Sequence, residues 1–116
     1  MIQIEINGNI LKVKLENNSS AKTLKESLEA GPITLQMDDY GNMEKVGSLG
    51  HSLPTNDRHL TTKAGDVILY QGHNLVIYHR PNTWSFTKLG EVLDLDEDEI
   101  RQKLGEGPMQ VTLTLD

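Results

Sequence analysis

Short runs in which apolar and polar residues alternate recur along the chain, and this pattern constrains its fold more than any other feature. The first run, 2–6, is followed by Asn7-Gly8, a dipeptide that accepts the positive φ angles of a two-residue hairpin turn. Such a turn gives the pairs Ile6–Asn9, Ile4–Leu11 and Ile2–Val13. The paired isoleucine, leucine and valine side chains then share one face, so the sequence predicts a β-hairpin with one buried face.

The same alternation, bounded by turn residues, predicts short strands through most of the remaining chain. We expect them near residues 33–37, 43–46, 58–61, 66–70, 75–78, 84–89 and 111–115. Residues 38–64 have no sustained period, so the two strands expected within them are the least well defined. A functional loop over 38–64 is the alternative.

Two segments instead place apolar residues at helical spacing. In the first, Ala21, Leu24 and Leu28 share a face, and Ser19 or Ser20 is expected to cap the helix. In the second, which ends near Gly105, Asp96 and Glu99 have the spacing of a capping box. Each segment predicts a short helix, and the first is expected to lie against a sheet.

The strongest apolar runs, 66–70 and 75–78, flank a glycine-containing turn. A type II′ turn centred on Gly72-His73 would pair Tyr70 with Leu75 and Asp66 with His79. Because apolar residues then occupy both faces, we expect a central pair of strands that is covered on each side.

About eight strands and two short helices, with no linker or repeat, fit into 116 residues. A chain of this length has room for one hydrophobic core and not for two. The sequence therefore predicts a single domain over 1–116, mostly β, folded as a closed or nearly closed barrel of roughly eight strands.

Composition narrows the classes of function. The chain has 11 Lys and Arg against 17 Asp and Glu, a net charge of −6, which disfavours nucleic acid and anionic membrane as partners. Cysteine is absent, which excludes disulfides, thiolate metal sites and thiol nucleophiles. There is no signal-peptide pattern, no long apolar run and no glycine-rich phosphate loop. We expect a soluble cytoplasmic protein with no cofactor.

Several short motifs occur in a characteristic order and spacing. They are Asp39-Tyr40-Gly41-Asn42-Met43-Glu44-Lys45-Val46-Gly47, Leu53-Pro54, Gly65-Asp66-Val67, Tyr70, Trp84-Ser85 and Leu89-Gly90. Together they resemble the pattern of the prokaryotic cyclophilin-like family, small proteins of uncharacterised function. The resemblance implies a closed eight-stranded barrel capped by helices, in agreement with the strand count. It implies no reaction, ligand or catalytic residue.

True cyclophilins, which isomerise the peptide bond before proline, offer a second comparison. Tyr78-His79-Arg80 is similar to their Phe-His-Arg stretch and Gln71-Gly72 to their Gln-Gly-Gly, but the order is reversed. Phe86 is the only phenylalanine, and five aromatic residues leave little material for a proline pocket. A weak prolyl isomerase that uses Arg80 is therefore the alternative to a binding function.

Catalysis by Asp66 and His79 is a further alternative. If the two face each other across a hairpin, the carboxylate could orient the imidazole as a base in a small hydrolase or metal enzyme. A cross-strand polar pair is the simpler interpretation. The four histidines lack the spacing of a metal site, and the acids at 94–99 lack the glycine and the final glutamate of a calcium loop. We expect no metal.

The favoured hypothesis is a binding module without efficient catalysis. Arg80, Trp84 and Phe86 cluster around one turn, where an Arg and a Trp can hold a ligand. Residues 41–62 would wall the groove. The residues expected to bind the ligand are Tyr70, Arg80, Trp84, Phe86, Asn42, Glu44 and Arg58. The expected ligand is a small molecule or a proline-containing peptide. Binding to a partner protein is kept as a further alternative.

Overall fold

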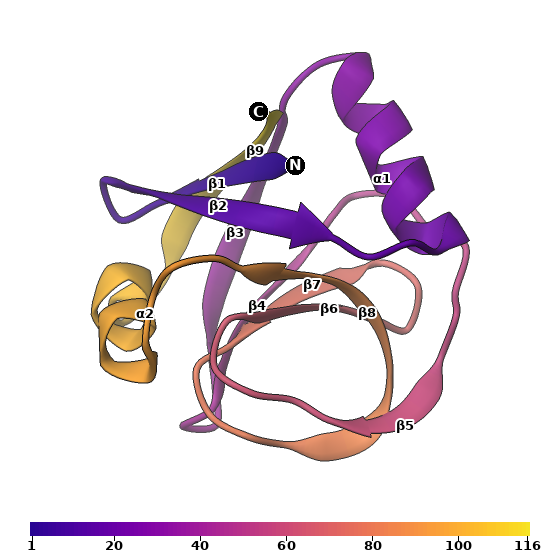
Figure 1. Ribbon diagram of the computed structural model, residues 1–116. Helices are drawn as coiled ribbons and strands as arrows, with labels where there is room; N and C mark the ends of the chain where they lie inside the picture. Colours follow the sequence, from indigo (N-terminus) through magenta and orange to yellow (C-terminus); the bar gives the residue numbers. More distant parts are fainter.

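The computed structural model describes all 116 residues, which form nine strands and two helices (Figure 1). The strands are β1 (Ile2–Ile6), β2 (Asn9–Leu15), β3 (Ile33–Tyr40), β4 (Glu44–Ser48), β5 (Arg58–Thr61), β6 (Asp66–Tyr70), β7 (Asn74–Tyr78), β8 (Thr83–Val92) and β9 (Met109–Leu115). The helices are α1 (Ser19–Glu29) and α2 (Glu97–Leu104). Both strands expected within 38–64 are present, as β4 and β5.

Eight of the strands form a closed antiparallel barrel, as predicted. They follow the order β2-β1-β9-β3-β4-β7-β6-β8, and β8 returns to pair with β2. The closing pair needs a glycine, because a Cβ atom on Gly90 would lie 2.5 Å from the carbonyl oxygen of Lys14. The hairpin β1–β2 has the predicted register, with Ile6 opposite Asn9 and Ile2 opposite Val13.

The barrel interior holds the main core, a cluster of twenty buried apolar residues. Helix α1 contributes Leu24 and Leu28 to it, and α2 contributes Ile100 and Leu104, from opposite sides of the molecule (Figure 1). The capping box of α2 is present as predicted. The predicted serine cap of α1 is wrong, since the side chain of Asn18 accepts the hydrogen bond from the backbone N–H of Ala21.

The predicted register of the β6–β7 hairpin is wrong by one residue. Tyr70 lies opposite Asn74, and Ile68 lies opposite Val76. The loop has three residues because Gln71, as well as Gly72, adopts a positive φ angle, which a non-glycine residue rarely does. A shift of one residue moves a side chain to the other face of the sheet, so Asp66 and His79 are not cross-strand partners.

Strands β6 and β7 are covered on both faces, as predicted. Their inner face contributes Val67 and Ile77 to the main core. Their outer face carries Ile68, Val76 and Tyr78, which join Phe86 in a second, smaller apolar cluster. Phe86 comes from the first half of β8, which extends beyond its pairing with β6 and pairs with β5. The outer cluster therefore lies between the barrel wall and the β5–β8 pair.

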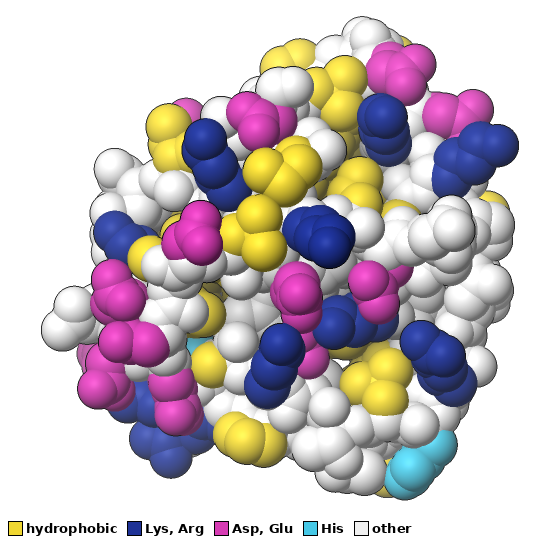
Figure 2. Space-filling view, in the orientation of Figure 1, with side chains coloured by type: hydrophobic (Ala, Val, Ile, Leu, Met, Phe, Trp, Pro, Cys, Tyr) yellow, Lys and Arg dark blue, Asp and Glu magenta, His cyan; other side chains and the backbone are white.

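Surface charge is mixed over most of the face shown in Figure 2, where basic and acidic side chains alternate. Acidic side chains gather over α2, whose first turn holds Glu97, Asp98 and Glu99. Neither helix is both long enough and apolar enough to cross a membrane.

Candidate functional site

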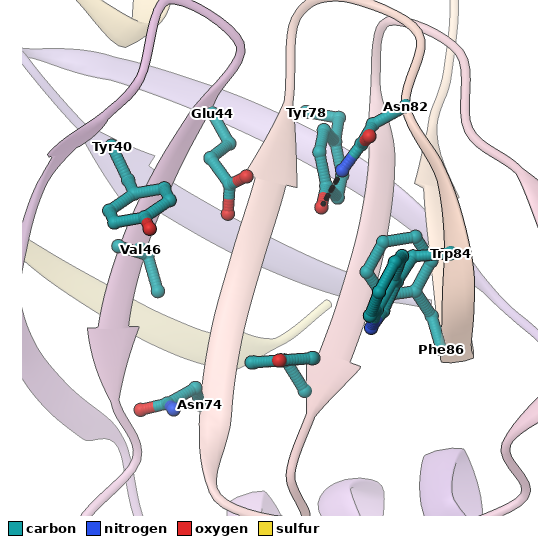
Figure 3. Close-up of a pocket in the computed structure, with 9 residues that line it drawn as sticks. Tyr40, Glu44, Val46, Asn74, Tyr78, Asn82, Trp84 and Phe86 are labelled. Atoms are coloured by element: carbon teal, nitrogen blue, oxygen red, sulfur yellow. Dashed lines mark hydrogen bonds between the residues drawn. The ribbon is translucent and has the colours of Figure 1, made fainter.

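A pocket with a volume of about 470 Å³ opens on the outer face of the barrel, above the second apolar cluster (Figure 3). We call it the aromatic pocket. Its lining residues are Tyr40, Glu44, Val46, Tyr70, Asn74, Tyr78, Asn82, Trp84 and Phe86. These include all three tyrosines, the one tryptophan and the one phenylalanine of the chain.

Strand register explains how distant residues meet in this pocket. Tyr40 on β3 lies opposite Glu44 on β4, and Glu44 lies opposite Tyr78 on β7. The three side chains thus form one row across three strands, with Glu44 in the middle. Val46 follows Glu44 on the same face of β4 because successive side chains alternate between faces.

The five aromatic rings divide into a floor and a rim. Tyr78 and Phe86 are buried, with their ring centroids 5.6 Å apart, and Tyr70 meets Phe86 edge-on at 6.2 Å. Tyr40 and Trp84 are 66% and 59% exposed. Figure 3 shows these two on opposite sides of the opening. The floor is therefore fixed by packing, while the two rings of the rim are open to solvent.

Two hydrogen bonds donated by Asn82 hold the Tyr78 hydroxyl in place. The Asn82 side-chain Nδ2 donates to it at 3.2 Å, and the Asn82 backbone N–H donates to Thr62 Oγ1 at 2.9 Å. Burial raises the pKa of Tyr78 to about 12, with a further rise from the nearby Glu44 carboxylate and an opposing effect of the Asn82 hydrogen bond. The phenol therefore stays protonated and can donate its proton inside the pocket.

Glu44 is the only charged residue in the lining, and its side chain points into the space between Tyr40 and Tyr78 (Figure 3). Burial raises the pKa of its carboxyl, and hydrogen bonding from Tyr78 offsets part of that rise. None of the six salt bridges in the structure involves Glu44. The pocket thus combines an aromatic wall with one carboxylate that has no cation beside it.

The structure brings together four of the residues predicted to bind a ligand, namely Glu44, Tyr70, Trp84 and Phe86. The other three lie elsewhere. Asn42 borders a separate polar cavity beside His79 and Arg101, and Arg58 borders a polar crevice beside Lys88. Arg80 is exposed and lines none of the four cavities.

Asp66 and His79, the predicted catalytic pair, are in different environments. Asp66 is buried, with its Oδ1 3.5 Å from Lys88 Nζ and its Oδ2 accepting the backbone N–H of Lys63. His79 is half-buried, and its pKa is lowered by burial and then by the positive charge of Arg101. The structure therefore gives no support to a base built from these two residues.

Sequence reasoning missed five lining residues, Tyr40, Val46, Asn74, Tyr78 and Asn82. Tyr40 and Tyr78 lie far apart in the chain and meet only through the pairing of β3, β4 and β7. The apolar second face of β7 was the available signal, because a covered outer face needs side chains to cover it. No group of three or more His, Asp or Glu residues is placed to hold a metal ion.

The sequence profile of a family described as the cyclophilin-like family matches residues 4–116. The chain belongs to the cyclophilin-like family. The family assignment agrees with the eight-stranded barrel and with the motif pattern between Asp39 and Gly90. In sequence, no protein with a curated description matches the chain.

Among solved structures, McbB in complex with tryptophan has a similar fold, with a TM-score of 0.71 and 18% sequence identity. The match covers 100% of this chain and 45% of McbB. The cyclophilin-like chain thus spans less than half the length of that protein, and the likeness at this identity concerns the fold.

Proposed function

We propose that this cyclophilin-like protein is a binding module that holds a small molecule or a short peptide segment in the aromatic pocket, without efficient catalysis. One observation carries the proposal: every aromatic side chain of a chain with only five of them lines the same pocket. Ligand pockets are typically a few hundred cubic ångströms in volume, with a mostly apolar wall and a few placed polar groups.

The polar groups of the pocket are suited to orienting a bound ligand. Glu44, Tyr78 and Asn82 can orient a ligand through a carboxylate, a hydroxyl and an amide. The lining contains no Ser, Thr, Cys, Lys or His to act as a nucleophile. McbB, which shares the fold, was solved with tryptophan bound, and an aromatic ligand of that kind matches the aromatic wall of this pocket.

The single tryptophan provides the test. Trp84 at the rim gives one indole N–H signal in a ¹⁵N-correlated NMR spectrum, so fragments that enter the pocket should shift that signal together with the backbone signals of Val46 and Asn74. Val46→Phe, which fills the pocket, should abolish the shifts. Ile10→Phe, at a residue that is 59% exposed and borders no cavity, should leave them unchanged.

A library of aromatic and aliphatic fragments that leaves all these signals in place would overturn the proposal. Shifts that persist in Val46→Phe would also overturn it, because they would place the binding outside the aromatic pocket.

A further inference from the structure

The charges buried in this protein are balanced everywhere except in the aromatic pocket. Three charged side chains are buried, Glu44, Lys45 and Asp66. Lys45 Nζ lies 2.8 Å from Asp39, and Asp66 lies 3.5 Å from Lys88 Nζ. Glu44 has no such partner, and no Lys, Arg or His lines its pocket. A buried charge without a partner is costly, so the missing positive charge is expected from outside the chain.

The surroundings of Glu44 are those that attract an organic cation. Tyr40 and Tyr78 flank it in register, and Trp84, Tyr70 and Phe86 complete the wall. The face of an aromatic ring carries partial negative charge, so rings attract ammonium groups, and cages of several rings recognise quaternary ammonium ligands. A carboxylate among the rings adds a full negative charge, which strengthens the attraction of the pocket for a cation.

A cation can also reach Glu44 through the opening of the pocket. The residue keeps 8% of its surface exposed, and its side chain points into the pocket. The rings of Tyr40 and Trp84 are largely exposed at the rim, where they can cover a ligand after it enters. The net charge of −6 favours the approach of a cation over that of an anion.

From these observations we infer that the ligand of the aromatic pocket is an organic cation, an alkylated or primary ammonium compound whose charged nitrogen lies against Glu44 between Tyr40 and Tyr78. This inference rests on the proposed binding function and names the chemical class of its ligand. The competing arrangement is a protonated Glu44 that donates a hydrogen bond to the carbonyl of a neutral ligand.

Two matched pairs of probes separate these arrangements. The small pair is choline and 3,3-dimethylbutan-1-ol. The alcohol has the shape of choline, with a carbon atom in place of the ammonium nitrogen. The larger pair is tryptamine and 3-ethylindole, which lacks the amino group of tryptamine. Titrations are followed by the Trp84 indole signal and the backbone signals of Val46 and Asn74. In at least one pair, the cation should bind about tenfold more tightly than its neutral counterpart.

Variants with a matched charge change complete the test. Glu44→Gln should remove the preference for the cation over its neutral counterpart. Glu26→Gln makes the same change of charge at an exposed residue of α1 that borders no cavity, and should have no effect. Tyr40→Ala removes an exposed ring without touching the core, and should weaken binding of the cation about threefold.

The outcomes distinguish this inference from the function on which it rests. If neutral fragments bind in the pocket while neither cation binds more tightly than its counterpart, the inference is overturned and the binding module stands. A preference for the cation that survives Glu44→Gln also overturns it. If no probe and no fragment shifts the pocket signals, the binding function itself fails.

Discussion

Glu44 is paired with Tyr78 across β4 and β7, which places a carboxylate beside a phenol that Asn82 already holds by its oxygen. Because Asn82 is the donor in that bond, the phenolic proton is free to point at Glu44. The Glu44 carboxylate has no counter-ion, and burial raises its pKa, so its charge is unfavourable for folding.

Removing this charge should stabilise the protein. We expect Glu44→Gln to raise the free energy of unfolding at neutral pH by on the order of 1 kcal/mol, because it removes a buried charge that lacks a partner. Urea unfolding followed by circular dichroism measures the change, with Glu26→Gln as the control. Lower stability of Glu44→Gln at neutral pH would show that the ionised carboxylate contributes favourably.

The effect of Glu44→Gln on stability should depend on pH. The folded-state pKa of Glu44 is raised above its usual 4.5, so folding favours the protonated form. The contribution of Glu44 to stability is therefore fully present below its unfolded-state pKa. This contribution is lost as the pH rises through its folded-state pKa. The difference in stability between wild type and Glu44→Gln should therefore shrink in acid and grow toward neutral pH. A difference that stays constant over this range would contradict the raised pKa.

Lys45 should be required for stability, although it is a charged residue in a barrel. Its side chain is fully buried, and its Nζ donates to the Gly107 carbonyl at 2.9 Å and lies 2.8 Å from Asp39. Lys45→Met should cost about 2 kcal/mol, less than a fully buried pair because Asp39 is partly exposed. Lys12→Met, at an exposed position of β2, serves as the control in urea unfolding. An unchanged midpoint for Lys45→Met would show that the ammonium contributes nothing.

Closure of the barrel should depend on Gly90. A Cβ atom there would lie 2.5 Å from Lys14 O and 2.9 Å from Val13 Cγ1, so Gly90→Ala must push β8 away from β2. We expect a loss of about 3 kcal/mol, at the upper end of overpacking effects. Gly50→Ala meets no atom within 4 Å and should lose only about 1 kcal/mol, through its positive φ angle. Equal losses in the two variants would show that the close approach at β2–β8 is unimportant.

Prolyl isomerisation that depends on Arg80 is not expected. Arg80 is exposed, lines no cavity and lies outside the aromatic pocket. Exchange between the cis and trans forms of a proline peptide, measured by NMR, should be equally slow with wild type and with Arg80→Ala. Faster exchange with the wild type alone would place an active groove at Arg80 and overturn the binding module without catalysis.

The sequence predicts the fold of this chain better than its site. The first hairpin is confirmed to the residue, because Asn7-Gly8 fixes the turn and alternation fixes the faces. The second hairpin is misplaced by one residue because Gln71 adopts a left-handed conformation that its residue type does not indicate. Trp84 and Phe86, which the sequence groups because they are close in the chain, both line the aromatic pocket. Tyr40 and Tyr78 were missed since only the pairing of β3, β4 and β7 brings them together.

The two apolar clusters place the barrel core on one face of β6–β7 and the floor of the aromatic pocket on the other. Val67 and Ile77 point inward and Ile68 and Val76 outward, so the barrel keeps its interior whatever replaces the outer rim. Substitutions at Trp84 or Tyr40, both largely exposed, alter the pocket without unpacking the core. If the aromatic pocket binds a ligand as proposed, substitutions at its rim should change which ligand it accepts while the barrel stays intact.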